Sequence, residues 1–283
     1  MDVTTFEAHR ALLFAVAYRM LGSAAEAEDA VQDAYLRCSD ASGVRDARAY
    51  LVSTVTRLCI DRLRSARHRR ESYVGPWLPE PLVGTVPDAA EHAELRESLS
   101  FAFLTVLETL SPPERAAFVL REVFGYPYPE IAEMLERSEA AVRQLVHRAK
   151  ARVGARRGRF GVSPDKHREV LDAFLDACSD GDVDRLASLL AGDAVVYTDG
   201  GGETRAALKP VRGRRAAARF LVNLAQKVPP GTSIEVAVVN GAPGIVLRSG
   251  GRVTAVLTLD APEGPIEAVY VVAAPSKLPP AAS

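Results

Sequence analysis

The chain has 283 residues, of which 48% are hydrophobic and 25% are charged. This length and composition suffice for two or three soluble domains with apolar cores, and they exclude a chain that is disordered throughout. The net charge of −1 hides a local concentration of basic residues. Between residues 137 and 159, eight Lys or Arg side chains stand against one acid, Glu139. Such a patch is typical of a surface that binds nucleic acid.

The cysteines and the start of the chain exclude further classes of protein. Cys38, Cys59 and Cys178 lie far apart, with no histidines at metal-ligand spacing, so we expect neither a disulfide framework nor a metal site. Each thiol is expected to be a small buried side chain. The apolar run at residues 11–17 is too short to cross a bilayer, and from this start of the chain we expect no secretory leader. We expect no cofactor, no membrane partner and a cytoplasmic location.

The first informative helix is predicted to begin at Ser23, which forms a capping box with Glu26. One face of this helix is apolar and is expected to lie in a core. The other face carries acids and an amide around an exposed apolar side chain: Asp29, Gln32, Asp33 and Leu36. A leucine ringed by acids suits a basic partner helix, although a solvated face with one exposed leucine is the alternative.

The next helix is predicted to begin near Asp46 and to carry a basic stripe opposite its apolar face. The stripe and its flanks include Arg57, Asp61, Arg62, Arg64 and Arg67. No carboxylate is present from residue 62 to residue 70 to neutralise these arginines. One guanidinium group can donate two parallel hydrogen bonds to phosphate oxygens, so a polyanion is the expected partner. A solvated helix end is the alternative.

A linker rich in proline and glycine follows, and it contains the only tryptophan of the chain. It cannot continue the helix. The tryptophan lies in the run Trp77, Leu78, Pro79, Glu80 and Pro81. A large aromatic ring between prolines is expected to dock on a neighbouring domain, because its exposure to water is unfavourable.

The segment from residue 107 to residue 153 is predicted to be a helix-turn-helix. Ser111 and two prolines begin a helix, a short helix spans residues 128–135, and a longer helix follows a turn that contains Glu136, where glycine is common. The cap and polar face of that last helix comprise Ser138, Arg143, Gln144, His147, Arg148 and Lys150. Guanidinium and amide groups on such a face can read bases in the major groove, whereas a generic helical hairpin is the alternative.

The last part of the chain is predicted to be a separate α+β domain. A helical opening at Pro164 gives way to β-branched runs at residues 233–240, 253–260 and 266–272. The resulting domain boundaries are 1–72 and 93–160 for two helical domains, 73–92 for the linker, and 161–283 for the α+β domain.

Three segments of the helical half resemble the two conserved domains of extracytoplasmic-function sigma factors of RNA polymerase. They are EDAVQDAYLR from residue 28, AYLVSTVTRLCIDRLRSARHRR from residue 49, and the helix-turn-helix from residue 110 to residue 153. The resemblance implies two partners, core RNA polymerase (its β′ clamp helices and β flap) and promoter DNA. It places Asp29, Gln32, Asp33 and Leu36 on the clamp helices, Arg57, Asp61, Arg62, Arg64 and Arg67 on the melted minus-ten element, and Ser138, Arg143, Gln144, His147, Arg148 and Lys150 on the minus-thirty-five element. Arg57 stands where the family commonly has asparagine.

The linker and the end of the chain resemble the subgroup with a fused C-terminal SnoaL-like domain. The resemblance implies a cone with helices near residues 164–179, 183–190 and 213–228 and a curved antiparallel sheet. Residues 77–81, WLPEP, are similar to the linker motif of that subgroup. Asp199, Gly200, Gly201 and Gly202 match a second motif, in which Glu203 replaces lysine, and Pro275, Lys277 and Leu278 are similar to a third. The resemblance implies that this domain regulates the sigma factor in cis.

Two alternatives remain open from the sequence. The SnoaL-like domain could bind an unidentified small molecule or catalyse an isomerase-like reaction, for which Asp199 beside Tyr197 and Tyr270 is the best constellation. The glycines after Asp199 indicate a turn, and no histidine follows His167, so we expect no enzyme. Alternatively, the chain could be a helix-turn-helix regulator that acts without polymerase, but such a regulator would not need the acidic first helix.

Overall fold

The computed structural model describes residues 1–39, 41, 43–71, 73–84, 98–154, 164–262 and 264–279, without the side chains of residues 66–71 and Pro164. The described chain forms two compact units. The first holds the residues up to 71, Ser98, Leu99 and residues 103–154, and the second holds residues 73–84, 100–102 and the chain from 164 onward. Among the described residues, no helix has the length and apolarity that a membrane span requires.

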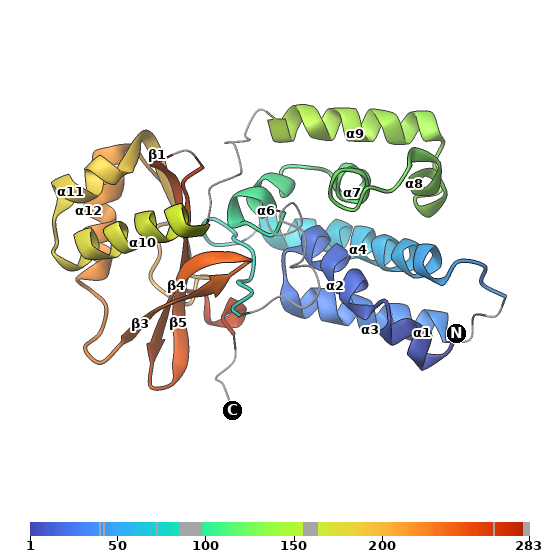
Figure 1. Ribbon diagram of the computed structural model, residues 1–283, viewed down its shortest axis with the longest axis horizontal. Helices are drawn as coiled ribbons and strands as arrows, with labels where there is room; N and C mark the ends of the chain where they lie inside the picture. The colour runs from blue at the N-terminus through green and yellow to red at the C-terminus, as the bar shows by residue number, and fades with distance from the viewer. Residues whose placement is uncertain are drawn as a thin grey trace. The chain divides into compact units, whose positions relative to one another are not determined.

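Four helices form the N-terminal half of the first unit (Figure 1). They are α1 (Val3–Glu7), α2 (Arg10–Leu21), α3 (Ala24–Cys38) and α4 (Ala47–Glu71). Gly22, with a φ of 68°, ends α2 in the left-handed conformation, and Ser23 Oγ accepts the N–H of Glu26 at 3.1 Å to begin α3. The apolar face of α3 is buried against α2 and α4, as its periodicity predicts.

The C-terminal half of the first unit contains the helix-turn-helix. Its elements are α6 (Phe101–Leu107, whose first two residues belong to the second unit), α7 (Pro112–Phe118), a π-helical turn (Val119–Val123), α8 (Tyr128–Met134) and α9 (Glu139–Gly154). Ser111 and Glu114 form a capping box at the start of α7. Glu136, in the turn between α8 and α9, has a φ of 52°.

Two buried arginines join the two halves of the first unit. Arg19 of α2 donates from Nε to Ser98 Oγ at 2.8 Å, and its guanidinium lies 5.4 Å from the centre of the Phe124 ring. Arg115 of α7 donates from Nη1 to the carbonyl of Met20 at 2.7 Å and pairs with Glu108 at 2.6 Å. Charged groups inside a core require such partners, because their desolvation is costly.

The second unit packs three helices on a six-stranded sheet. The helices are α10 (Pro164–Ser179), α11 (Val183–Leu189) and α12 (Arg214–Ala225). The strands are β1 (Leu190–Asp199), β2 (Val211–Arg212), β3 (Ser233–Val239), β4 (Ala242–Ser249), β5 (Arg252–Asp260) and β6 (Ile266–Val272), in the order β2-β1-β6-β5-β4-β3. All neighbours are antiparallel except β1 and β6, so the sheet expected to be antiparallel is mixed. Strands β3 to β6 follow one another as antiparallel neighbours. The last of them, β6, lies between β5 and β1 and runs parallel to β1.

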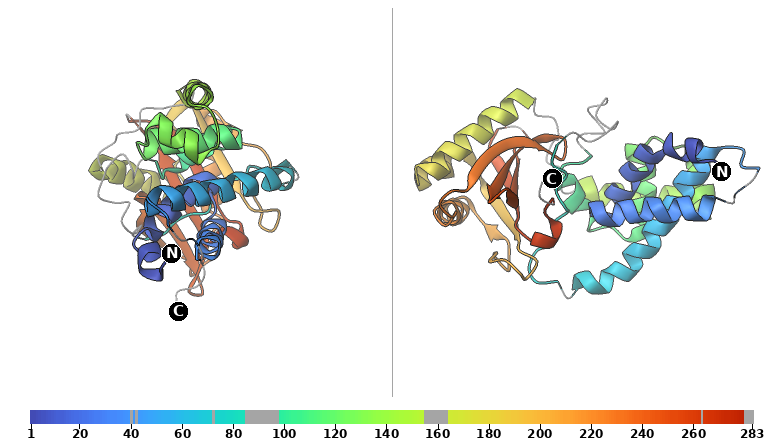
Figure 2. Two further views of the ribbon diagram at one scale, coloured as in Figure 1. Left: turned by 90° about the vertical axis from the view of Figure 1, so that its right-hand side faces the viewer. Right: turned by 90° about the horizontal axis from the view of Figure 1, so that it is seen from below.

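The sheet is curved, and helices lie along one side of it (Figure 2). Buried apolar side chains lie on both of its faces. In β6, Val269 and Val271 face the core formed with the three helices, whereas Tyr270 and Val272 face a second core. That second core includes Leu78 of the linker and Phe101 of α6. The linker therefore packs on the second unit and contributes to its second core. The three cysteines are buried, as expected, and their thiols are free.

Candidate functional site

The acidic face of α3 presents the apolar side chain that the sequence indicates. Leu36 is 69% exposed, and Gln32 beside it is exposed as well. Asp33 accepts a hydrogen bond from Arg62 Nη2 at 2.6 Å, and Asp29 lies 3.9 Å from the same guanidinium. Because Arg62 points at α3, it fixes the acids of this face.

The basic stripe of α4 is split among three environments. Arg62 is 26% exposed and is committed to α3, where it also donates to the carbonyl of Glu26 at 3.2 Å. Arg64 pairs with Asp61 at 3.3 Å, and both side chains are largely exposed. Arg57 contacts the helix-turn-helix, as detailed below. The side chain of Arg67 lies outside the described residues.

The exposed face of α9 forms a shallow groove of about 510 Å³. Ser138 accepts the N–H of Ala141 at 3.3 Å and caps the helix. The groove is lined by Tyr128, Arg143, Gln144, Val146, His147, Arg148 and Lys150. The sequence analysis predicts five of these seven residues, because the 3.6-residue period places them on one face.

Acids behind the groove hold its basic side chains in place. Arg148 lies 3.4 Å from Glu114, and Arg152 lies 2.9 Å from the same carboxylate. Burial alone would raise the pKa of Glu114, but hydrogen bonds from Ser111 and the charges of Arg152 and Arg148 hold this pKa below its usual value. Arg143 pairs with Glu139 and lies 4.3 Å from the centre of the Tyr128 ring. The cations are therefore positioned before any polyanion arrives.

In the second unit, a buried carboxylate binds the linker. Asp199 is 1% exposed, and it accepts hydrogen bonds from Tyr73 Oη at 2.6 Å, Leu78 N at 2.8 Å and Gly201 N at 3.0 Å. Lys277 Nζ lies 2.7 Å from Asp199 Oδ2 and donates to the Leu78 carbonyl at 2.7 Å. The structure thus brings together residues from all three motifs that the sequence analysis singles out.

Aromatic rings enclose the ammonium group of this cluster. Lys277 Nζ lies 4.2 Å from the centre of the Trp77 ring and 4.7 Å from that of the Tyr73 ring. Burial and the hydrogen bond to Asp199 raise the pKa of Tyr73, so this phenol remains a donor. Leu278 packs against the second core, and Pro79 and Pro81 are buried, whereas Pro275 is exposed. Glu80 is partly buried.

The glycines that follow Asp199 allow a close approach of the backbone. A Cβ at Gly200 would lie 2.2 Å from the Thr204 carbonyl oxygen. Gly201 and Gly202 have φ values of 65° and 78°, which favour glycine. The turn inferred from the sequence is therefore required at this position.

The linker also extends the sheet. Leu82 N donates to Asn240 Oδ1 at 2.9 Å, and Asn240 N donates to the Leu82 carbonyl at 2.9 Å. Val83 then forms an antiparallel bridge with Val239 at the end of β3. Sequence reasoning missed Tyr73, Asn240 and Phe101 at this site. An asparagine at the end of a strand carries no signal of a distant partner.

A small cavity of about 30 Å³ lies at the concave face of the sheet. Phe101 fills this face, with its ring centre 5.9 Å from that of Tyr270. His167, Thr258 and Asp260 also line the cavity, and burial raises the pKa of Asp260 to about 6. Tyr197 and Tyr270 stack with ring centres 5.3 Å apart, and burial together with the charges of Asp260 and Glu267 raises the pKa of Tyr270. The Asp199 carboxylate considered for isomerase chemistry is hydrogen-bonded to Tyr73, Leu78 N and Lys277. Within the described residues, no cluster of His, Cys, Asp and Glu could hold a metal ion.

Three family descriptions cover the chain. Residues 5–69 match Sigma-70 region 2, residues 100–153 match Sigma-70 region 4, and residues 171–273 match the SnoaL-like domain. Two sigma-70 regions, an acidic α3 face and a helix-turn-helix with a basic groove define a sigma factor, a non-enzymatic protein that directs RNA polymerase to promoters.

The relatives specify the family further. The chain is 41% identical to the "ECF RNA polymerase sigma factor SigJ" of Mycobacterium tuberculosis, over 98% of this chain and 93% of the relative. It is 33% identical to the "Probable ECF RNA polymerase sigma factor SigI" of the same organism, over 97% of this chain and 94% of that relative. The crystal structure of SigJ superposes with a TM-score of 0.78 at 37% identity, covering 98% of each chain. The chain belongs to the extracytoplasmic-function (ECF) sigma factors, which confirms the resemblance found in the sequence.

Proposed function

We propose that the exposed face of α3 is the surface that binds core RNA polymerase, at the β′ clamp helices. The observation that carries this assignment is Leu36, which is 69% exposed beside Asp29, Gln32 and Asp33. A large apolar side chain ringed by acids suits a partner helix that is apolar at its centre and basic around it. We assign a contact with the β flap to the region 4 half of the first unit.

Two surfaces of the first unit are assigned to promoter DNA. The exposed groove of α9, with Arg143, Gln144, His147, Arg148 and Lys150, suits the major groove of the minus-thirty-five element. Arg57, Asp61 and Arg64 of α4 suit the minus-ten element. The commitment of Arg62 to α3 makes it a support for the polymerase-facing acids, so we assign it that role rather than a base contact.

The SnoaL-like domain regulates the sigma factor in cis by holding the linker. This assignment is supported by the cluster around Asp199 and Lys277, which fixes the backbone at Leu78 through both its N–H and its carbonyl. The linker joins region 2 to region 4. The contacts of Asp199 and Lys277 with Leu78 therefore set how many linker residues are free to span the distance between the two regions. A small-molecule ligand that binds beside Tyr270 would have to displace Phe101, because the cavity at this position measures about 30 Å³.

The polymerase assignment is tested by transcription in vitro with core RNA polymerase and a promoter library. Leu36→Asp is expected to weaken association with core polymerase at least about tenfold, because it removes a central apolar anchor. Val3→Asp changes another exposed apolar residue, 56% exposed and outside the proposed surface, and serves as the control. Equal affinity of both variants and the parent would contradict the assignment.

A further inference from the structure

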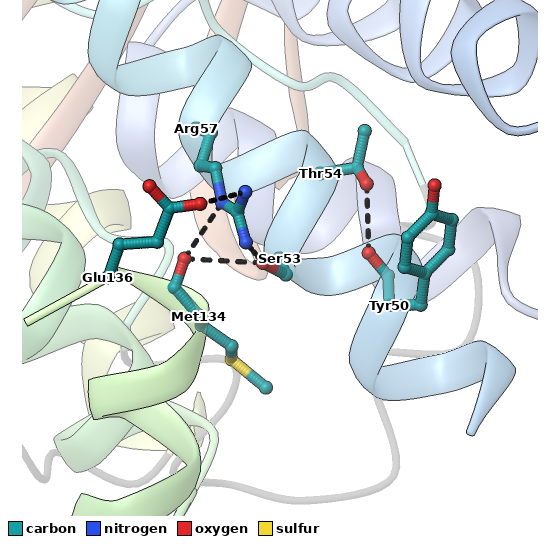
Figure 3. Close-up of polar contacts among 6 residues, drawn as sticks. All are labelled: Tyr50, Ser53, Thr54, Arg57, Met134 and Glu136. Carbon is teal, nitrogen blue, oxygen red and sulfur yellow. Dashed lines mark hydrogen bonds and ion pairs between the residues drawn. The ribbon is translucent and has the colours of Figure 1, made fainter. Parts of the chain in front are cut away.

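A helix of region 2 caps a helix of region 4 inside the first unit (Figure 3). Ser53 Oγ and Arg57 Nε of α4 both donate to the carbonyl of Met134, the last residue of α8, at 3.2 and 3.0 Å. Arg57 Nη2 donates to Ser53 Oγ at 2.8 Å, and Nη1 lies 2.6 Å from Glu136 Oε1. Each of the three nitrogens of the Arg57 side chain therefore donates a hydrogen bond within the chain.

The chemistry of a helix end explains why an arginine lies there. The last carbonyls of a helix have no partner in the helix, and the macrodipole leaves partial negative charge on them. Met134 and Ser53 are buried, so this carbonyl is shielded from water and depends on the α4 donors. Glu136 adds a full negative charge from the turn that follows α8. The turn thus offers Arg57 the same kind of acceptors that a phosphate backbone offers.

The contact lies in a cleft of about 250 Å³ between the two regions. Region 2 contributes Arg57, Ile60, Asp61 and Arg64, and region 4 contributes Pro113, Leu135, Glu136 and Arg137. The α4 residues assigned to the minus-ten element therefore face the helix-turn-helix. While the Arg57 guanidinium is held by the turn, it cannot contact a DNA strand, whereas Asp61 and Arg64 remain largely exposed.

We propose that the contact of Arg57 with Met134 and Glu136 is an autoinhibitory latch, in which Arg57 holds either the turn of the helix-turn-helix or promoter DNA. The proposal rests on the proposed function, because it takes the α4 stripe to be a promoter surface. In the latched state the free sigma factor cannot use Arg57 to contact the minus-ten element. Binding to core polymerase separates region 2 from region 4 and frees Arg57 for DNA.

Two features of the interface between region 2 and region 4 favour its opening. Arg115 crosses it with 2% exposure, and among the described residues its Nε is buried without a hydrogen-bond partner. A buried donor without a partner is costly, and opening the interface would hydrate it. The Arg57 and Glu136 side chains are 48% and 72% exposed, so their ion pair is weak and reversible.

The latch is tested in the full chain by removing one charge from the turn between α8 and α9. Glu136→Gln removes the ion pair with Arg57, and Glu133→Gln removes the same charge from an exposed position of α8 and is the matched control. Ser53→Ala is a second test variant, because it deletes a donor to Met134 without changing the charge. Two readouts are taken: initiation by core polymerase at subsaturating sigma factor, and the distance between spin labels on Tyr50→Cys of α4 and Glu130→Cys of α8.

We expect Glu136→Gln and Ser53→Ala to raise initiation about two- to fivefold over Glu133→Gln, the range for loss of one exposed ion pair or one hydrogen bond. The label distance of the free protein should lengthen in both variants, and that of the parent should lengthen when core polymerase binds. A parent distance that stays the same in initiating complexes would overturn the latch. A longer distance without increased initiation would also overturn it. By contrast, initiation that is insensitive to Arg64→Ala would contradict the minus-ten assignment and not the contact itself.

Discussion

Lys277 Nζ lies 2.7 Å from Asp199 Oδ2, and the side chains of the two residues are 8% and 0% exposed. They lie 78 positions apart in the chain, yet both also bind the backbone of Leu78, one at its carbonyl and the other at its N–H. A buried ion pair gains from such extra hydrogen bonds, because they offset the desolvation of both charges. This pair therefore fixes the linker on the SnoaL-like domain.

Replacing Lys277 by methionine is expected to destabilise the second unit by about 3–5 kcal/mol, the usual cost of leaving one partner of a buried pair uncompensated. Denaturant unfolding followed by tryptophan emission measures the loss, because Trp77 is the only tryptophan and lies beside the ammonium group. Lys209→Met, at an exposed position, is the control. Equal unfolding midpoints for the two variants would show that the pair does not support the linker.

The parts of this site that could be predicted from the sequence are those with local signals. Trp77 between prolines indicates docking, and the glycines after Asp199 indicate a turn. Tyr73 and Phe101 could not be identified in this way, because their partners lie more than 120 residues away and no periodicity marks them. The expected antiparallel sheet is mixed for a related reason: strand order depends on long-range pairing, which hydrophobic alternation does not encode.

Gly200→Ala is expected to destabilise the second unit by about 1–3 kcal/mol, because overpacking forces the backbone to move. The added Cβ would meet the Thr204 carbonyl oxygen at 2.2 Å and the Ala206 Cβ at 2.9 Å. Thermal unfolding of the full chain measures the effect. Gly192→Ala is the matched control, since a Cβ there meets nothing within 4 Å. If both substitutions shift the melting temperature equally, the turn after Asp199 is not as tight as described.

The helical half shows the same division between local and long-range signals. The polar face of α9 follows from its 3.6-residue period, and the groove contains five of the residues predicted there. The partner of Arg62 does not follow from the sequence of α4, because Asp33 belongs to another helix. Periodicity shows which side chains share a face, but it does not show which neighbouring helix that face contacts.

Asp260 should make the stability of the second unit depend on pH. Burial, with a smaller contribution from the Glu267 charge, raises the pKa of Asp260 to about 6, whereas an unfolded aspartate has a pKa of about 3.9. Between these values the folded state binds more protons, so the free energy of unfolding falls as the pH rises from about 4 to about 6, by roughly 3 kcal/mol in all. Asp260→Asn should therefore be more stable than the parent at pH 7.5 and nearly equal to it at pH 4.

Chemical denaturation at the two pH values measures this difference directly. Asp193→Asn, at an exposed position of β1, controls for the loss of one negative charge. A difference between Asp260→Asn and the parent that is the same at both pH values would show that Asp260 is not held in a buried environment.

Arg148→Ala and Arg64→Ala should each weaken binding of the holoenzyme to promoter DNA and reduce the salt dependence of that binding. Loss of one phosphate contact lowers the slope of log K against log salt by about one unit, because one fewer counterion is released. The fold should tolerate Arg148→Ala, because Arg152 remains paired with Glu114 at 2.9 Å. Arg168→Ala removes an equally exposed arginine from α10 of the second unit and should leave the slope unchanged. Filter binding of the holoenzyme across salt concentrations measures all three slopes, and a parental slope for Arg148→Ala would exclude α9 from contact with the DNA backbone.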